Sequence, residues 1–306
     1  MRKGWTICLL TLLCTSMTGC NQMGVKQNPS SAFDQVRDHF SAQDSYAFYG
    51  RTKLLTENSA NANVVNFSGR KDKDAVYMNV KLSMPDEKRV DSLSLLHQGD
   101  KLYAKQGSDA EWKNVSHTQA AYQQEMDNWD PASCFSQMAD MQKNIRQLPD
   151  EDPNDDVEAI RVTLDSAKLK NWLVTQMNEQ TQGTETTGSH IQSAAAAHKP
   201  RLKLAMALSD GSWKKSATGQ KGPRIQSESN PAPNVREIVD QMDVNADYTV
   251  YYNRTSMLPT TITMSIRSQY DVNGQRVNEH SQVETYLQNY GRVKPLPTPT
   301  ESQSSR

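Results

Sequence analysis

One pair of residues in this 306-residue chain has the spacing of a serine nucleophile and an activating lysine. Ser212 and Lys215 satisfy the Ser-x-x-Lys pattern, in which a serine hydroxyl can attack a carbonyl carbon. The pair stands in a long polar segment, and the Ser-Asp-Asn and Lys-Thr-Gly segments that complete such a site are missing from the chain. We therefore do not expect catalysis at this pair.

A run of carboxylates at residues 150–156 offers the oxygen ligands that Ca²⁺ prefers. It lacks the glycine turn and distal glutamate of an EF-hand loop, so a solvated acidic connection is the better interpretation. The six histidines are dispersed and show no paired spacing of a metal site. No phosphate-binding glycine loop, nucleophile elbow or Cys-x-x-Cys motif is present. The sequence thus predicts no catalytic residues, no metal and no cofactor, and we expect that the protein is not an enzyme.

The first twenty residues carry a different kind of chemistry. Arg2 and Lys3 precede a short apolar run, and small and polar residues then lead to Gly19 and Cys20. About ten apolar residues are too few for a membrane-spanning helix, which needs about 20, so residues 1–19 are predicted to be a secretion signal. The Gly-Cys ending resembles the bacterial lipobox, which implies that Cys20 is diacylated after cleavage. The alternative is an ordinary signal peptide with an incidental cysteine.

This N-terminus predicts a lipid-anchored protein on the extracytoplasmic face of the cell membrane. Residues 20–32 are predicted to be the lipidated end and a polar tether. Because the other cysteines lie in or at the end of the signal, Cys134 is the only thiol left, and we interpret it as a small buried hydrophobe.

Composition excludes two further classes of protein. The chain has 34 Lys and Arg against 35 Asp and Glu, a net charge of −1, which gives no field to attract nucleic acid. Hydrophobic residues make up 36% of the chain, and the mean hydropathy is −0.77, so a multi-pass membrane protein does not fit.

Alternating apolar and polar residues predict strands in the first and last thirds of the chain. The clearest strand has Val76, Met78, Val80 and Leu82 on its apolar face. Neighbouring strands are predicted at 46–55, 64–70, 93–97 and 101–105, and later ones at 160–164, 202–208, 248–252, 262–266 and around 283–286. The Asn273-Gly274 dipeptide predicts a hairpin turn.

Helical spacing appears between these strands. Apolar residues at intervals of three or four follow Pro131, and the helix that they predict carries Phe135, Met138, Met141, Ile145 and Leu148. This methionine-rich face suits either an adaptable ligand surface or an ordinary core. Asp165 or Ser166 is predicted to cap a second helix, whose apolar face contains Leu169, Trp172, Leu173 and Met177. A short helix is predicted at 235–242.

Two segments are so polar that folding would bury too little apolar surface to offset the conformational entropy lost when the chain becomes ordered. They are predicted to be mobile excursions at 178–199 and 209–234, and the proline-rich residues 292–306 are predicted to be an extended tail. We expect a single domain over 33–291.

The order of signal, first meander, helices and closing meander resembles the LolA-like lipoprotein-carrier superfamily, including its LppX–LprG group. The segment Thr255-Ser256-Met257-Leu258-Pro259 is similar to the turn before the last hairpin of that superfamily, and 290–295 is similar to the terminal strand of Gram-positive members. The resemblance implies an α+β fold, a strongly curved antiparallel sheet forming an open half-barrel around helices. Its concave face would be lined or filled by Val76, Met78, Val80, Leu82, Phe135, Met138 and Met141.

The resemblance implies that a lipid or another apolar ligand binds in the half-barrel. The alternative is an envelope sensor, regulatory or protein-interaction lipoprotein with a filled core and a protein partner. Both hypotheses give the membrane, reached through lipidated Cys20, as a partner and exclude nucleic acid.

Replacing Cys20 with Ser tests the anchor. The variant should lose the acyl chains and lipoprotein-type processing, because the thioether needs the cysteine sulfur. Metabolic labelling with a fatty acid and fractionation of cells measure both effects, with Cys134→Ser as the control. Retention of labelled lipid in the Cys20 variant would reject the lipobox assignment.

Overall fold

The computed structural model describes residues 28–54, 64–84, 88–107, 111–116, 119–149, 156–182, 235–272 and 275–299. The predicted signal, Cys20, the strand at 202–208, Ser212, Lys215 and the excursion at 209–234 lie outside these residues. The same is true of most of the acidic run and most of the excursion at 178–199. Among the described helices, none combines the length and apolar character needed to cross a membrane.

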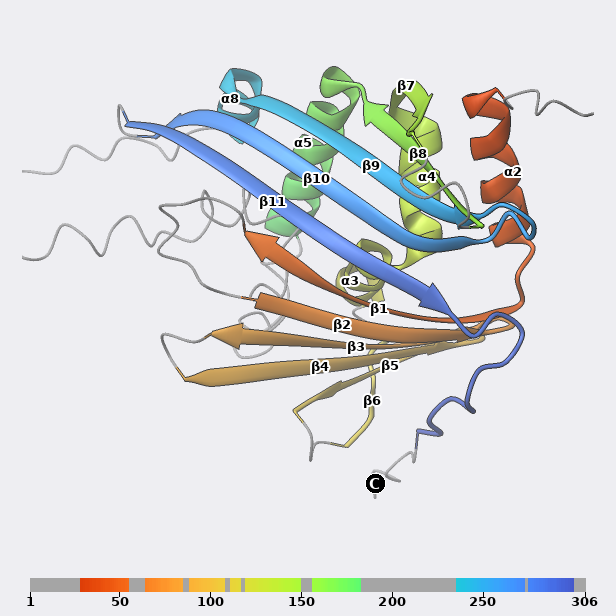
Figure 1. Cartoon of the computed structure of the whole chain (residues 1–306). Helices are drawn as coiled ribbons and strands as arrows, with labels where there is room; N and C mark the ends of the chain where they lie inside the picture. The colour runs from red at the N-terminus through yellow and green to blue at the C-terminus, as the bar shows by residue number, and fades with distance from the viewer. Residues whose placement is uncertain are drawn as a thin grey trace, which may run out of the picture.

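One antiparallel sheet of eleven strands forms the body of the molecule (Figure 1). In chain order the strands are β1 (Ser45–Leu54), β2 (Val64–Asp72), β3 (Ala75–Met84), β4 (Arg89–Gln98), β5 (Lys101–Gln106), β6 (Lys113–Asn114), β7 (Gln142–Gln147), β8 (Val157–Leu164), β9 (Asp243–Asn253), β10 (Pro259–Val272) and β11 (Gln275–Gln288). Their spatial order is β6-β5-β4-β3-β2-β1-β11-β10-β9-β8-β7. The sheet is curved and unclosed, with β6 and β7 at its two edges, which confirms the predicted fold class.

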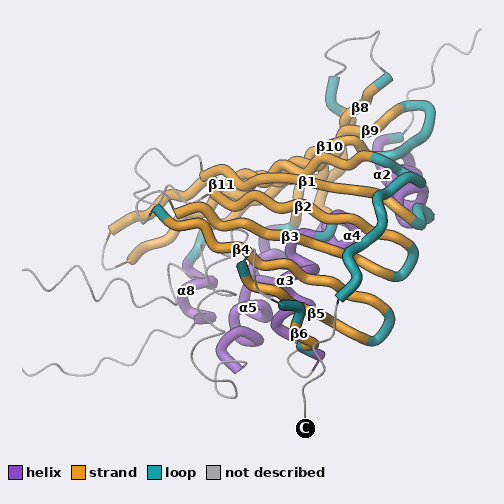
Figure 2. Tube along the Cα trace, turned by 90° about the horizontal axis from the view of Figure 1, so that it is seen from below, coloured by secondary structure: helices purple, strands orange, loops and turns teal. Residues whose placement is uncertain are grey.

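Five helices are described: α2 (Pro29–Ser41), α3 (Gln119–Trp129), α4 (Pro131–Met141), α5 (Ser166–Gln182) and α8 (Val235–Gln241). Helices α3, α4, α5 and α8 lie on one side of the sheet, and α2 stands at the end of the strands beside β7–β9 (Figure 2). We call the sheet face toward the helices the inner face and the opposite one the outer face.

Strand alternation decides which side chains enter the core. On β3, Met78, Val80 and Leu82 are buried, while the intervening Asn79 and Lys81 point to the outer face. Cross-strand neighbours continue the apolar rows, as Val80 lies opposite Phe67 on one side and Leu93 on the other. Such same-face pairs stabilise a sheet because each shields its neighbour from water.

Two glycines let aromatic rings lie flat on the inner face of β1 and β2. A Cβ atom at Gly69 would stand 2.2 Å from Cζ of Phe48, and one at Gly50 would stand 2.3 Å from Cζ of Phe67. Each phenylalanine therefore occupies the space that a side chain on the neighbouring strand would need. Glycine within a strand often marks such close approach.

Three helices begin at an Asx cap followed by the first helical turn. Asn28 Oδ1 accepts from Ser30 N at 3.0 Å, and Asp130 Oδ1 accepts from Ala132 N at 3.1 Å. Asp165 Oδ1 accepts from two backbone N–H groups, at 2.9 Å and 3.0 Å. These bonds satisfy N–H groups that the helix itself leaves unpaired. The sequence predicted Pro131 in the first turn of α4 and Asp165 or Ser166 as the cap of α5, whereas the Asp130 cap was not predicted. Helix α2 begins at Pro29, within the range expected to be tether.

The structure corrects the boundaries of two predicted helices and adds two helices, α2 and α3, that the sequence analysis did not predict. The helix after Pro131 ends at Met141, and Ile145 lies instead on β7, opposite Val162 of β8. Hydrogen bonding to a neighbouring strand outweighs the local helical spacing there. Helix α5 extends to Gln182, into the predicted excursion at 178–199.

Gly69→Ala should destabilise the fold, because its Cβ would displace the ring of Phe48. We expect a loss of about 1–3 kcal/mol, typical of an overpacked core, measured by urea unfolding. Ser68→Ala, an exposed neighbour on the same strand, is the control. Adding Phe48→Leu to the Gly69 variant should recover part of the loss, and equal stability of Gly69→Ala and Ser68→Ala would contradict this packing.

Candidate functional site

The candidate site is the apolar interior, which we define as the buried side chains between the inner face and the helices. All seven residues that the sequence assigned to it lie in or against one contiguous cluster. Met78, Val80 and Leu82 come from β3 on one half of the sheet, whereas Phe135, Met138 and Met141 come from α4. Six are buried, and Val76 is half-buried at the margin.

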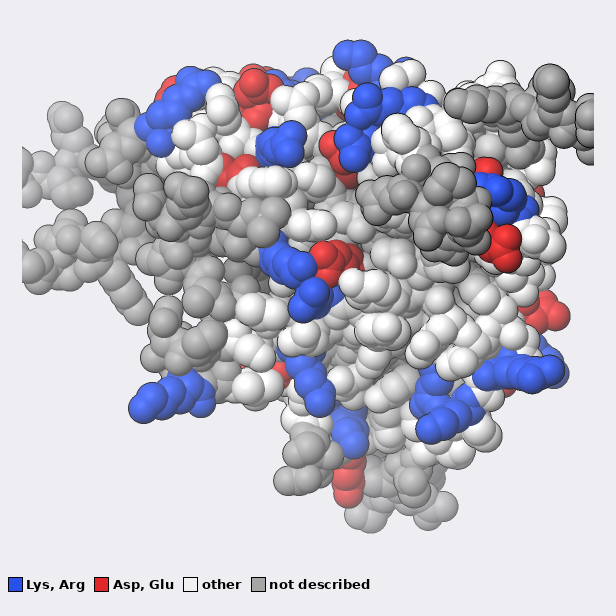
Figure 3. Space-filling model, in the orientation of Figure 1, with Lys and Arg blue, Asp and Glu red and all other residues white. Residues whose placement is uncertain are grey.

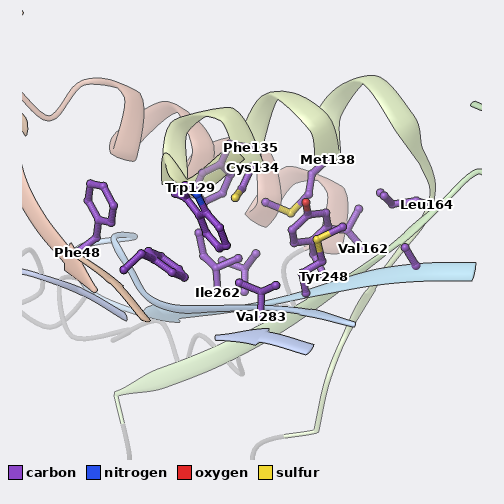
Figure 4. Packing of buried hydrophobic residues seen from close by; sticks show 14 of the residues in the cluster. Phe48, Trp129, Cys134, Phe135, Met138, Val162, Leu164, Tyr248, Ile262 and Val283 are labelled. Atoms are coloured by element: carbon purple, nitrogen blue, oxygen red, sulfur yellow. The ribbon is translucent and has the colours of Figure 1, made fainter. Parts of the chain in front are cut away.

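Helix α4 packs over the other half of the sheet. Met138 and Phe135 face Tyr248, Ile262 and Val283, which come from three adjacent strands (Figure 4). Cys134 is buried on the same helix, as expected. The one polar tip in this group is satisfied, because the Tyr248 hydroxyl and Oε1 of Gln137 lie 2.7 Å apart in a hydrogen bond.

Aromatic rings fill the end of the interior next to α2. The ring of Phe40 lies 4.7 Å from that of Tyr46 and 5.2 Å from that of Phe135, measured between centroids. Tyr290 stands edge-on to Phe40 at 6.4 Å. Tilted and edge-on contacts at these separations suit the quadrupoles of the rings. This end of the interior is therefore packed.

A buried carboxylate lies on α3. Glu125 is 1% exposed, and its Oε1 accepts a hydrogen bond from Trp129 Nε1 at 3.0 Å. The indole ring in turn packs on Phe67, with centroids 4.6 Å apart. Sequence reasoning missed this pair, although the spacing of Tyr122, Met126 and Trp129 is helical and places Glu125 next to the apolar face.

A second polar contact joins the sheet to the start of α4. The Tyr46 hydroxyl donates to Asp130 Oδ1 at 3.2 Å, and Lys71 Nζ stands 5.8 Å from the centre of the Tyr46 ring. Although Asp130 as a residue is half-exposed, desolvation of its carboxyl group raises its pKa, against the lowering by the hydrogen bonds from Ala132 and Tyr46. Desolvation and the Asp130 charge raise the pKa of Tyr46 as well.

Apolar side chains at the margin of the interior are only partly covered. They include Ile266 in the middle of β10, Val277 near the start of β11, and Trp172 and Val174 on α5. Ile266 lies on the inner face, between Ala246 and Ser281 of the neighbouring strands. These residues define the part of the apolar interior that solvent reaches.

The outer face carries a contact between a serine hydroxyl and a histidine ring. Ser265 Oγ and His280 Nε2 lie 3.0 Å apart, and desolvation followed by the charge of Arg267 lowers the pKa of His280. The pair lies on the opposite side of the sheet from the apolar interior, and a hydroxyl–imidazole contact alone does not define a catalytic site.

On the face of the molecule shown in Figure 3, both basic and acidic side chains are present among uncharged residues. Within the described ranges, His, Cys, Asp and Glu side chains form no group of three that could hold a metal ion.

No protein-family model matches the chain. No curated protein matches it either. Among solved structures, the lipoprotein LppX of Mycobacterium tuberculosis is 10% identical, with 88% of this chain and 100% of that chain covered and a TM-score of 0.37. LprF of Mycobacterium bovis is 10% identical, with 89% and 96% covered and a TM-score of 0.40. LppX belongs to the group that the sequence resembles, but similarity at this level does not assign a function to this chain.

The two aspartate caps should change stability with pH in opposite directions. Desolvation raises the native pKa of Asp130, so stability falls as pH rises from the ordinary carboxyl pKa through the raised one. Hydrogen bonds from Lys168 N and Ala167 N lower the native pKa of Asp165, so its contribution is present above the ordinary pKa and is lost in acid.

Asp130→Asn and Asp165→Asn test this contrast, because Asn keeps the capping oxygen and removes the titration. Urea unfolding from about pH 3 to pH 7 measures it. As pH rises, the free energy of unfolding of Asp130→Asn should fall less than that of the parent protein. As pH falls, the free energy of unfolding of Asp165→Asn should fall less than that of the parent protein. Profiles parallel to that of the parent would contradict the assignment.

Proposed function

We propose that this chain is a non-enzymatic, lipid-anchored lipoprotein on the extracytoplasmic face of the membrane that binds a lipid or another apolar ligand in its apolar interior. The observation that carries the proposal is the cluster of buried apolar residues that spans the inner face of an unclosed sheet. Val80 and Phe67 on one half and Ile262 and Val250 on the other belong to one cluster that crosses the β1–β11 junction.

An acyl chain matches the chemistry of this surface. It needs no hydrogen-bond partners, and each methylene removed from water contributes about 0.8 kcal/mol. The aromatic end beside α2 is packed, so the proposed entry lies at the half-covered margin that includes Ile266 and Val277, on the half of the sheet where α8 contacts β10 and α5 contacts β9. Met138 and Met141 would adapt to the ligand, since unbranched methionine fills irregular spaces.

The anchor would keep the apolar interior close to the bilayer. Cys20 and Pro29, where α2 begins, are nine positions apart, a span of at most about 30 Å when the chain is extended. Two acyl chains give stable attachment. A protein that takes a lipid from a membrane benefits from such a short distance, because the ligand has little water to cross.

Extraction of the purified protein with organic solvent, followed by mass spectrometry, tests the proposal. The chain processed at Cys20 carries its own covalently attached acyl groups. The measurement therefore counts only the lipid that the solvent releases while this covalent attachment stays intact. We expect stoichiometric lipid or another apolar compound, and native mass spectrometry should show the matching mass increase.

Two tryptophan substitutions locate the binding surface. Ile266→Trp fills the half-covered margin and should lower the amount of bound lipid several-fold, whereas Arg267→Trp places the same side chain on the outer face and should leave it unchanged. Lipid-free protein, together with a protein partner crosslinked in intact cells, would overturn the proposal in favour of an interaction module with a filled core.

A further inference from the structure

The last described segment does not leave the molecule after β11. The chain turns through positive φ angles at Asn289 and Gly291, and Gly291 N donates to Ser45 O at 3.0 Å. Tyr290 anchors this turn, because its hydroxyl donates to the carbonyl of Pro259 while its ring faces Phe40. Residues 292–299, which we call the tail, then cross the outer face from β1 toward β5 (Figure 2).

A single row of side chains follows this course across five strands. The register places Ala47, Arg70, Tyr77, Leu96 and Tyr103 opposite one another in that order on β1 to β5. We call this row the track. Although it lies on the outer face, Leu96 is 0% exposed and Tyr103 only 6%. The outer face is thus covered along this row.

Arg70 holds the tail by its backbone. Its Nη1 donates to the carbonyl oxygens of Lys294, at 3.2 Å, and Pro295, at 3.0 Å. The guanidinium also lies 5.3 Å from the centre of the Tyr77 ring, and that ring meets Trp112 edge-on at 6.4 Å. Planar stacking and forked donors are properties that distinguish arginine from lysine.

The tail has the composition of an extended ligand. Prolines stand at positions 295, 297 and 299, and the described tail contains neither helix nor strand. Val293, Leu296, Pro297 and Pro299 are half-buried, while Arg292, Lys294, Pro295 and Thr298 are exposed. Proline-rich segments lose little entropy on binding, and aromatic surfaces with hydrogen-bond donors to their free carbonyls recognise them.

We propose that the track is a binding site for extended proline-rich peptides and that the tail occupies it as an intramolecular ligand. Tyr77 and Leu96 of the track, with the adjoining Trp112, recognise the apolar side chains of the peptide, which in the tail are Leu296, Pro297 and Pro299, and Arg70 recognises backbone carbonyls. While the tail is in place, a second segment of the same kind is excluded. Release of the tail opens the track to the tail of another copy.

A truncated chain and a synthetic peptide test the proposal. The chain ending at Gly291 should bind a fluorescently labelled peptide of residues 292–306, whereas the full chain should bind it at least about tenfold more weakly, because a linked ligand competes at high effective concentration. Anisotropy measures the affinity, and circular dichroism checks the fold of the truncated chain.

Matched variants identify the contacts. In the truncated chain, Arg70→Ala should weaken peptide binding about tenfold or more, the effect of losing a central arginine. Arg51→Ala, which removes an outer-face arginine paired with Glu284 instead, should not. A peptide with alanine at the three proline positions should also bind more weakly. Equal binding of both peptides, or equal binding by the full and truncated chains, would overturn the proposal.

Trypsin cleavage of the full chain gives a second measurement that does not depend on truncation. The bond after Arg292 should be cut slowly in the parent and in Arg51→Ala, and several-fold faster in Arg70→Ala, with the loss of residues 293–306 followed by mass spectrometry. Equal rates in all three proteins would show that Arg70 does not hold the tail, and would reject the track.

Discussion

The backbone pairing of β1 with β11 joins two meanders that are far apart in the sequence. Eight residues of β1, from Ala47 to Leu54, lie opposite β11, and this ladder turns β1–β6 and β7–β11 into one sheet. Forming it closes a loop of more than two hundred residues, an entropic cost that rises only slowly with loop length. Phe48 and Leu287, opposite each other across the ladder, enter the same core. Without this junction, neither meander would present an apolar face large enough to enclose the helices.

Three polar contacts in the interior fix the helices in place. The contacts of Glu125 with Trp129, Asp130 with Tyr46 and Gln137 with Tyr248 each involve α3, α4 or the residue between them. A buried polar group costs free energy unless it is hydrogen-bonded, and these partners offset that cost. The inner face of the sheet also carries the buried polar residues Thr52, Ser268 and Thr285 among its apolar rows. The contacts on α3 and α4 therefore fix how the helices sit on a sheet face that is mostly, but not wholly, apolar.

Sequence reasoning predicted the strands better than the helices. The alternation at 76–82 predicted both the strand and its buried face, because the residues of a half-buried strand alternate between apolar side chains in the core and polar side chains in solvent. Ile145 was assigned to a helix because its spacing from Met141 is four residues, and only pairing with β8 shows otherwise. The seven candidate interior residues do come together. The Tyr46–Asp130 contact joins residues 84 positions apart, and no local pattern announces such a contact.

The open edges of the sheet bear on how the interior could change size. In a closed barrel every strand is bonded on both sides, and its circumference is fixed by the number of strands and their stagger. Here the described residues provide no ladder between β6 and β7. A change in curvature therefore needs only small rotations between neighbouring strands and breaks no backbone hydrogen bond. The circumference of this unclosed sheet is therefore not fixed by strand number and stagger, and its curvature depends on the twist between neighbouring strands and on the side chains packed against its inner face.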